Sequence, residues 1–251
     1  MDLWWYPLLF LTGLVAGCVD AIAGGGGLLT VPVLLATGMP PQDALGTNKF
    51  QSSCGTTLAT WNYARHGLFD GQHLRVGIVA TLVGALLGTW TVTQIRPEFL
   101  RPLIPIVLIA IAGYTAWKPD LGSTSRPAFL TGTAFGTLFG LVLGFYDGVF
   151  GPGTGSFWTV ACVVVLGSDL LRATAYTKAM NLTSNLASLV LFASTGHVRY
   201  GIGLTMASGQ LLGGWLGARW AVRGGSARIR PVFLTMVVLL ALKLAFDTLR
   251  S

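Results

Sequence analysis

The chain alternates long apolar stretches with short polar joints. The apolar stretches cover residues 4–23, 28–38, 44–64, 74–95, 100–117, 127–150, 156–167, 170–194, 200–222 and 231–249. Long apolar stretches without alternation favour helices, because a segment that crosses a membrane must satisfy its own backbone hydrogen bonds. About 20 residues of helix cross the hydrocarbon layer. The pattern therefore predicts an all-α polytopic membrane protein with about eight spans.

Composition supports a lipid environment. Of 251 residues, 53% are hydrophobic and 10% are charged, whereas about 25% are charged in an ordinary soluble domain. The net charge of +7 comes from basic residues scattered singly at the ends of the apolar stretches, where they meet lipid headgroups. No basic run is interleaved with aromatic residues, so the lipid bilayer, and not a nucleic acid, is the expected partner.

The second half of the chain repeats the first. Identical residue types first recur at a spacing of 127 residues, at Gly13 and Gly140, Gly17 and Gly144, Asp20 and Asp147, and Gly24 and Gly151. After a two-residue insertion the spacing is 129, at Gly38 and Gly167, Ala44 and Ala173, and Lys49 and Lys178. Composition alone would not place aspartate and lysine in register with the glycines. The pattern predicts two tandem copies of one multi-helix unit, at residues 1–120 and 121–251.

Each predicted unit carries a glycine-rich stretch inside its first element. Residues 24–27 are four consecutive glycines, and residues 151–155 read Gly-Pro-Gly-Thr-Gly. Such a run would cost an intact helix about 1 kcal/mol per glycine, so we expect the helix to break at both places. A broken helix exposes amides and a positive dipole end, which together favour an anion. The alternative is close helix packing through glycine.

The third element of each unit is an unusually polar helix with a lysine deep inside it. Lys49 and Lys178 are too far from either surface to reach it easily. We expect these lysines, their polar neighbours and the breaks to bind the substrate. The expected binding residues are Thr47, Asn48, Lys49, Ser52, Lys178, Asn181, Gly25, Gly26, Gly27, Gly153, Thr154 and Gly155.

Two carboxylates lie beside the breaks. Asp20 and Asp147 share a helical stripe with the glycines, and a carboxylate facing lipid costs a few kcal/mol, so both must face protein or water. We expect one of them to couple transport to a proton or ion gradient. The alternative is structural: with Lys49 and Lys178 the four charges sum to zero, and buried ions usually pair.

The pattern from Gly13 and Gly17 through residues 24–27, Pro32 and Gly38 to the run at residues 44–48 resembles the sulfite exporter TauE/SafE family. The second copy fits that pattern more loosely. The resemblance covers nearly the whole chain. It implies a multi-pass permease of the bacterial inner membrane with two homologous halves, which carries sulfite, an organosulfonate or a related organic acid.

These observations predict a secondary transporter of a small anion. A passive anion channel would use the same buried lysines, so the sequence does not separate a channel from a carrier. An intramembrane enzyme is the less favoured alternative because no nucleophile–base pair is evident. No nucleotide-binding motif, metal-ligand spacing or cofactor motif occurs, so no metal or cofactor is expected. The substrate, the direction of transport, homo-oligomer formation, and whether the two units are parallel or inverted all stay open.

Overall fold

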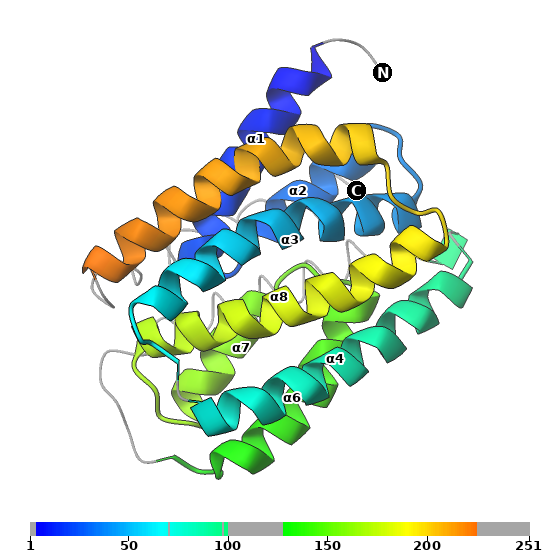
Figure 1. The fold of residues 1–251 in the computed structure, drawn as a ribbon. Coiled ribbons are helices and arrows are strands. Elements are labelled where there is room, and N and C mark those ends of the chain that lie inside the picture. Colours follow the sequence, from blue (N-terminus) through cyan, green and yellow to red (C-terminus); the bar gives the residue numbers. More distant parts are fainter. Residues whose placement is uncertain (1–3, 70, 97, 100–127, 225–251) are drawn as a thin grey trace, which may run out of the picture.

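The computed structural model describes residues 4–69, 71–96, 98–99 and 128–224, and every regular element among them is a helix. In chain order these are α1 (Trp5–Ala23), α2 (Gly26–Ala36), α3 (Pro41–Arg65), α4 (Gly71–Gln94), α6 (Gly132–Val149), α7 (Thr154–Val164) and α8 (Leu170–Ser194). Residues 200–224 form a further helix, orange in Figure 1. The predicted all-α fold is confirmed. The expected segments 100–117 and 231–249 lie outside the described residues, as does the expected boundary at residue 120.

The first expected break is present. α1 ends at Ala23, and Gly24 follows with a φ of 77°, in the left-handed region. α2 then begins at Gly26. A residue with a Cβ is strained at this φ, which is why a glycine can end the helix here. No continuous helix runs from α1 into α2.

The second expected break is also present. α6 ends at Val149, and α7 begins at Thr154. Gly151 and Gly153 both have a φ of 84°. Pro152 between them has no amide hydrogen with which to continue a helix, and its carbonyl oxygen accepts a hydrogen bond of 2.8 Å from the Tyr146 hydroxyl.

Short helices follow both breaks. α2 and α7 each have 11 residues, which corresponds to about 16 Å of helix. That is about half of the hydrocarbon thickness of a bilayer. Each therefore has the length of a half-span. α2 follows the end of α1, and α7 follows the end of α6.

The outer helices pack through glycine. A Cβ built on Gly17 of α1 would lie 2.6 Å from the Gln210 carbonyl oxygen, and one built on Gly144 of α6 would lie 2.6 Å from the Thr81 carbonyl oxygen. No side chain fits at these distances, so the backbones approach as closely as in small-residue seams of membrane helices. α1 thus packs on the helix of residues 200–224, and α6 packs on α4. Each seam joins the two halves of the chain.

Helices that match in the two halves run in opposite directions. In Figure 1, α3 runs from right to left and α8 from left to right; α4 and the helix of residues 200–224 are opposed in the same way. The sequence did not decide whether the two copies are parallel or inverted. If the predicted duplication holds, its copies are inverted. The duplication itself stays a prediction.

α3 and α8 lie in the middle of the bundle and carry its polar interior. Their buried polar side chains are Gln42, Asp43, Thr47, Asn48, Lys49, Gln51, Ser52, Ser53, Thr56 and Asn62 on α3, and Thr174, Thr177, Lys178, Asn181, Ser184, Asn185 and Ser188 on α8. Among the described residues, the helical segments long and apolar enough to cross a membrane are Trp5–Ala23, Leu74–Gln94 and Gly132–Val149. α3 and α8 are long enough but less apolar, because their polar side chains face other helices. The expected total of about eight spans stays a prediction.

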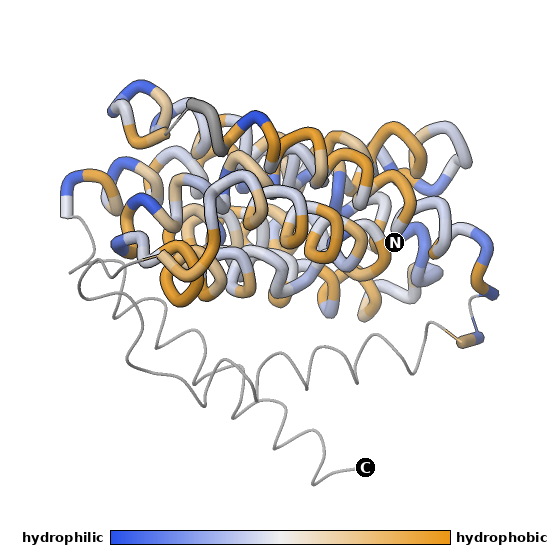
Figure 2. The backbone as a smooth tube through the Cα atoms, turned by 90° about the horizontal axis from the view of Figure 1, so that it is seen from below, coloured by the Kyte–Doolittle hydropathy of each residue, from blue (hydrophilic) through white to orange (hydrophobic). Residues whose placement is uncertain are grey.

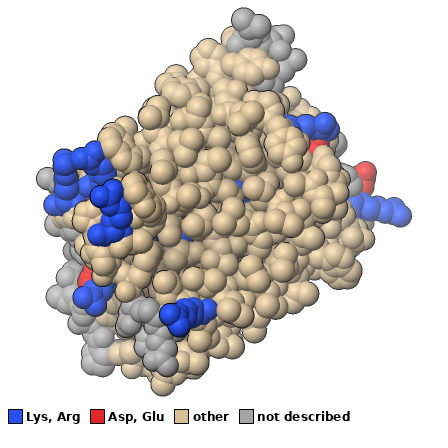
Figure 3. All heavy atoms as spheres, in the orientation of Figure 1, with Lys and Arg blue, Asp and Glu red and all other residues tan. Residues whose placement is uncertain are grey.

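The outer surface is apolar between two charged ends. Large side chains such as Leu11, Val79 and Val190 are more than half exposed. Figure 3 shows basic and acidic side chains mainly toward the edges of the molecule. Figure 2 likewise shows most hydrophilic residues near the ends of the helices, with hydrophobic residues between them. A continuous apolar surface of this kind requires lipid as its solvent.

Candidate functional site

The two breaks cross at the centre of the bundle. A Cβ built on Gly24 would lie 2.6 Å from the Gly155 carbonyl carbon, and one built on Gly27 would lie 3.1 Å from the Pro152 Cα. The start of α7 therefore rests directly on the backbone of the first break. Both N-cap residues, Gly25 of α2 and Gly153 of α7, lack a side chain that could cap the helix, so the helix starts offer amides to other acceptors.

Asp20 connects the first break to α8. Its Oδ1 accepts a hydrogen bond of 3.3 Å from the amide of Gly26, the first residue of α2. Its Oδ2 lies 2.9 Å from the Lys178 ammonium, which also donates to the Asp20 carbonyl oxygen. The carboxylate thus occupies the helix start that the sequence predicted to favour an anion.

Asp147 has the matching position at the second break. Its Oδ1 lies 2.9 Å from the Lys49 ammonium and accepts a hydrogen bond of 3.0 Å from the hydroxyl of Thr154, the first residue of α7. Its Oδ2 accepts a hydrogen bond from the Ser184 hydroxyl. All four groups are buried.

The ion pairs are exchanged between the halves. Lys49 of the first half pairs with Asp147 of the second, and Lys178 of the second half pairs with Asp20 of the first. Neither lysine, although both were expected to bind the substrate, is unpaired in this structure, because each ammonium contacts a carboxylate. The buried ion pairs of the structural alternative, between the two aspartates and the two lysines, are therefore present. Their formation leaves open whether an anion can compete for either lysine.

The two lysines are not equally satisfied. The Lys178 ammonium donates two hydrogen bonds, both to Asp20. The Lys49 ammonium is 1% exposed, and its one ion-pair partner among the described residues is Asp147, whose Oδ1 lies 2.9 Å away. An ammonium carries three donors. Lys49 therefore contacts a single carboxylate oxygen, whereas Lys178 contacts two oxygens of Asp20.

The second break leaves room for the Lys49 ammonium. A Cβ built on Gly151 would lie 3.3 Å from Lys49 Nζ and 3.5 Å from Asp147 Oδ1. Any side chain at this position would crowd the ion pair, besides being strained at the local φ of 84°. The same glycine thus permits the turn and the close approach of the charges.

Each short helix is tied to its polar neighbour. The Thr30 hydroxyl of α2 donates to the Asn48 side-chain oxygen of α3 over 2.5 Å. At the matching positions, the hydroxyls of Thr159 on α7 and Thr177 on α8 lie 3.2 Å apart. These bonds fix α2 against α3 and α7 against α8. Asn48 was expected in the site; the two threonines of the short helices were missed, although the spacing of 129 residues relates them.

The other expected binding residues lie in three places. The glycines of the breaks, with Thr154 and Asn181, lie at the crossing, where the Asn181 amide nitrogen is 2.8 Å from a Cβ built on Gly155. Ser52 belongs to the Asn48 network through Gln51, which donates to both side chains. Thr47 lies elsewhere: its hydroxyl accepts a hydrogen bond of 3.0 Å from the Arg199 amide. Whether any of them binds a substrate stays a prediction.

A second buried carboxylate cluster lies outside the crossing and was not anticipated. Asp43, in the first turn of α3, accepts from Arg199 Nε at 2.7 Å and lies 2.8 Å from His197 Nδ1. These contacts hold the start of α3 against the segment before the helix of residues 200–224. Only the fold brings these positions together, since they are more than 150 residues apart.

An apolar all-helical shell around a buried, charged centre defines an integral membrane protein. The model of the sulfite exporter TauE/SafE family matches residues 9–244, and the chain belongs to that family. A relative from Haemophilus influenzae is 41% identical over 96% of this chain and 94% of its own length. YfcA of Escherichia coli K12 is 39% identical over 96% of this chain and 90% of its own length. Both are named probable membrane transporter proteins, and this chain is a membrane transporter and not an enzyme.

Proposed function

We propose that the chain is a secondary transporter that carries a small oxyanion, of the sulfite or organosulfonate class, across the bacterial inner membrane as a multi-pass protein. The observation that carries this proposal is the Lys49 ammonium, which is buried beside the start of α7 and has Asp147 as its one ion-pair partner among the described residues. An anion of this class would lose its water on binding, and only close cationic and amide donors offset that cost.

The chemistry follows from competition between the substrate and Asp147. In the structure Asp147 is the anion that neutralises Lys49, and it accepts a hydrogen bond from the Thr154 hydroxyl at the start of α7. A substrate oxyanion presents the same acceptors, so it can replace the carboxylate at these donors once Asp147 withdraws or takes up a proton. Inverted halves that meet at such a centre are the arrangement that opens a site alternately to each side of a membrane.

Proteoliposome flux tests this function. We expect the purified protein to move sulfite or a simple organosulfonate with saturable kinetics and counterflow, whereas chloride is expected to be a poor substrate. Saturable counterflow separates a carrier from a passive channel, in which flux rises with the gradient and trans substrate has no accelerating effect. Absence of flux for every sulfur oxyanion and organic acid tried would remove the substrate class from the proposal.

Coupling to a proton is assigned to the two carboxylates at the breaks. Asp20→Asn and Asp147→Asn keep the shape of the side chain but remove its ability to exchange a proton, so we expect each to flatten the dependence of the transport rate on pH. The measurement is the initial rate of uptake from mildly acidic to mildly alkaline pH. Asp43→Asn is the matched control, because Asp43 is a buried carboxylate outside the crossing. Unaltered pH profiles in both break variants would leave these carboxylates with a structural role only.

A further inference from the structure

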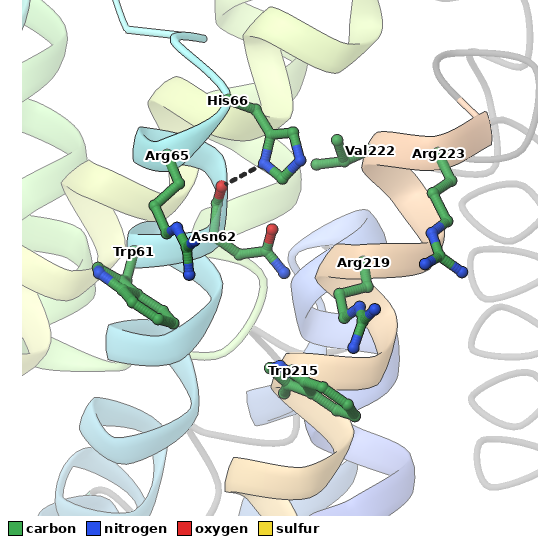
Figure 4. A pocket seen from close by; sticks show the side chains of 8 residues that line it. All are labelled: Trp61, Asn62, Arg65, His66, Trp215, Arg219, Val222 and Arg223. Carbon is green, nitrogen blue, oxygen red and sulfur yellow. Dashed lines mark hydrogen bonds between the residues drawn. The ribbon is translucent and has the colours of Figure 1, made fainter.

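A basic pocket lies at one end of the bundle, between the last turns of α3 and those of the helix of residues 200–224. It has a volume of about 400 Å³, and its wall includes Trp61, Arg65, His66, Trp215, Arg219 and Arg223. Figure 4 shows the α3 side chains facing those of the other helix across the opening. In Figure 3 this end of the molecule carries a group of basic side chains at the left edge of the view.

Each helix contributes the same arrangement of tryptophan and arginine. The Arg65 guanidinium lies 4.7 Å from the ring centre of Trp61, and the Arg219 guanidinium lies 4.5 Å from that of Trp215. Both pairs are one helical turn apart, the spacing at which side chains on a helix meet. Stacking on a ring fixes the plane of a guanidinium while its N–H donors stay free for a ligand.

The described lining of the pocket carries positive charge and no carboxylate. None of its lining residues is acidic, and Arg65, Arg219 and Arg223 form no ion pair with a carboxylate of the described residues. His66 Nδ1 lies 2.7 Å from the Asn62 carbonyl oxygen. A carbonyl can only accept, so this hydrogen bond requires the proton on Nδ1. Three guanidiniums in the lining of one pocket favour an oxyanion.

The apolar surface continues directly from the pocket. On the helix of residues 200–224, Leu212 and Leu216 are each 50% exposed and lie within one turn of Trp215. Trp61 and Trp215 are themselves 52% and 37% exposed. Exposed tryptophans beside arginines at helix ends are typical of the level of lipid headgroups. A ligand that fits this surface has an anionic head and an apolar tail.

The predicted repeat does not place these charges at both ends of the bundle. At the opposite end of the bundle, the positions that match Trp61 and Arg65 are Val190 and Ser194. The positions that match Trp215, Arg219 and Arg223 are Leu86, Trp90 and Gln94. None of these matching positions carries a cation, so the arginines of the pocket are not part of the predicted repeat.

We propose that this pocket binds the phosphate headgroup of an anionic phospholipid, whose acyl chains lie along the exposed leucines of the helix of residues 200–224. The pocket is open at the rim of the bundle, whereas the charged crossing of the breaks is buried, so the lipid site is separate from the proposed transport centre. A negative result for lipid binding would not affect the proposed function.

Lipid binding to the full-length protein tests this site. Binding of phosphatidylglycerol to the detergent-purified chain is measured by native mass spectrometry and by the rise in thermal unfolding temperature that added lipid causes. Phosphatidylcholine and inorganic phosphate serve as parallel probes. We expect phosphatidylglycerol to bind, and Arg219→Gln and Arg223→Gln each to weaken its binding about fivefold. Arg172→Gln is the matched control, because Arg172 is an exposed arginine at the same end that faces Asp169.

The outcomes separate three ligands. Equal binding of phosphatidylglycerol to the wild type and to the double variant Arg219→Gln, Arg223→Gln would overturn the assignment, as would an equal loss in Arg172→Gln. Equal binding of phosphatidylcholine would reduce the site to an apolar surface, and displacement of the lipid by inorganic phosphate would make it a site for free oxyanions. Should the double variant unfold without lipid, Arg65→Gln applies the same test from α3.

Discussion

Lys49→Ala is expected to abolish transport and to weaken binding of the transported anion at least about tenfold, the loss of one charge-assisted hydrogen bond. The change removes the buried ammonium that, among the described residues, is paired with Asp147 alone. It also leaves Asp147 buried without its cation, which destabilises a protein by about 3–5 kcal/mol. Binding measured by calorimetry and unfolding measured in detergent, on the same preparation, report the two effects separately.

The double variant Lys49→Met, Asp147→Asn decides between an anion site and a structural ion pair. It removes both charges of the pair together, so we expect folding stability to return to near the wild-type value while transport stays absent. Recovery of transport together with stability would assign Lys49 to structure. The same double change at Lys178 and Asp20 is the comparison, because Lys178 already uses its donors within the protein. Its single Lys178→Ala variant is expected to lose more stability than Lys49→Ala.

Adding one methyl group at the crossing of the breaks is expected to destabilise the fold by about 1–3 kcal/mol and to stop transport. In Gly155→Ala, the new Cβ would lie 2.5 Å from the Cα of Gly24. Backbone cannot rotate away as a flexible side chain can, so the two halves must separate at their centre. Thermal unfolding in detergent and flux in proteoliposomes measure the result.

Three glycine variants separate packing from backbone strain. Gly24→Ala combines a clash with Gly155 and a positive φ, so it is expected to cost more than Gly155→Ala. Gly38→Ala has a φ of 83° but no atom within 4 Å of the new Cβ, and is expected to show only the strain of about 1–2 kcal/mol. Gly201→Ala meets open space in a helix and is expected to be neutral or stabilising by up to about 1 kcal/mol. Losses at Gly155 no larger than at Gly201 would contradict a close crossing.

Sequence alone predicted the features that depend on local chemistry. Long apolar stretches define helices because lipid offers the backbone no partner. The glycine runs predicted both breaks, because an unbroken helix is unfavourable there. Asp20, Asp147, Lys49 and Lys178 stood out because an ionised side chain inside an apolar stretch must meet a partner. The family followed from a motif that is continuous in the sequence.

Only the tertiary structure decided how these parts meet. The spacing of the repeat allows each lysine to pair within its own half or with the other half, and the crossing of the breaks selects the exchanged pairs. The stacked Trp61–Arg65 and Trp215–Arg219 pairs are local, but the pocket between them exists because α3 and the helix of residues 200–224 end side by side. Periodicity and propensity act over a few turns of one helix, whereas pairing and direction depend on contacts between residues more than 90 positions apart.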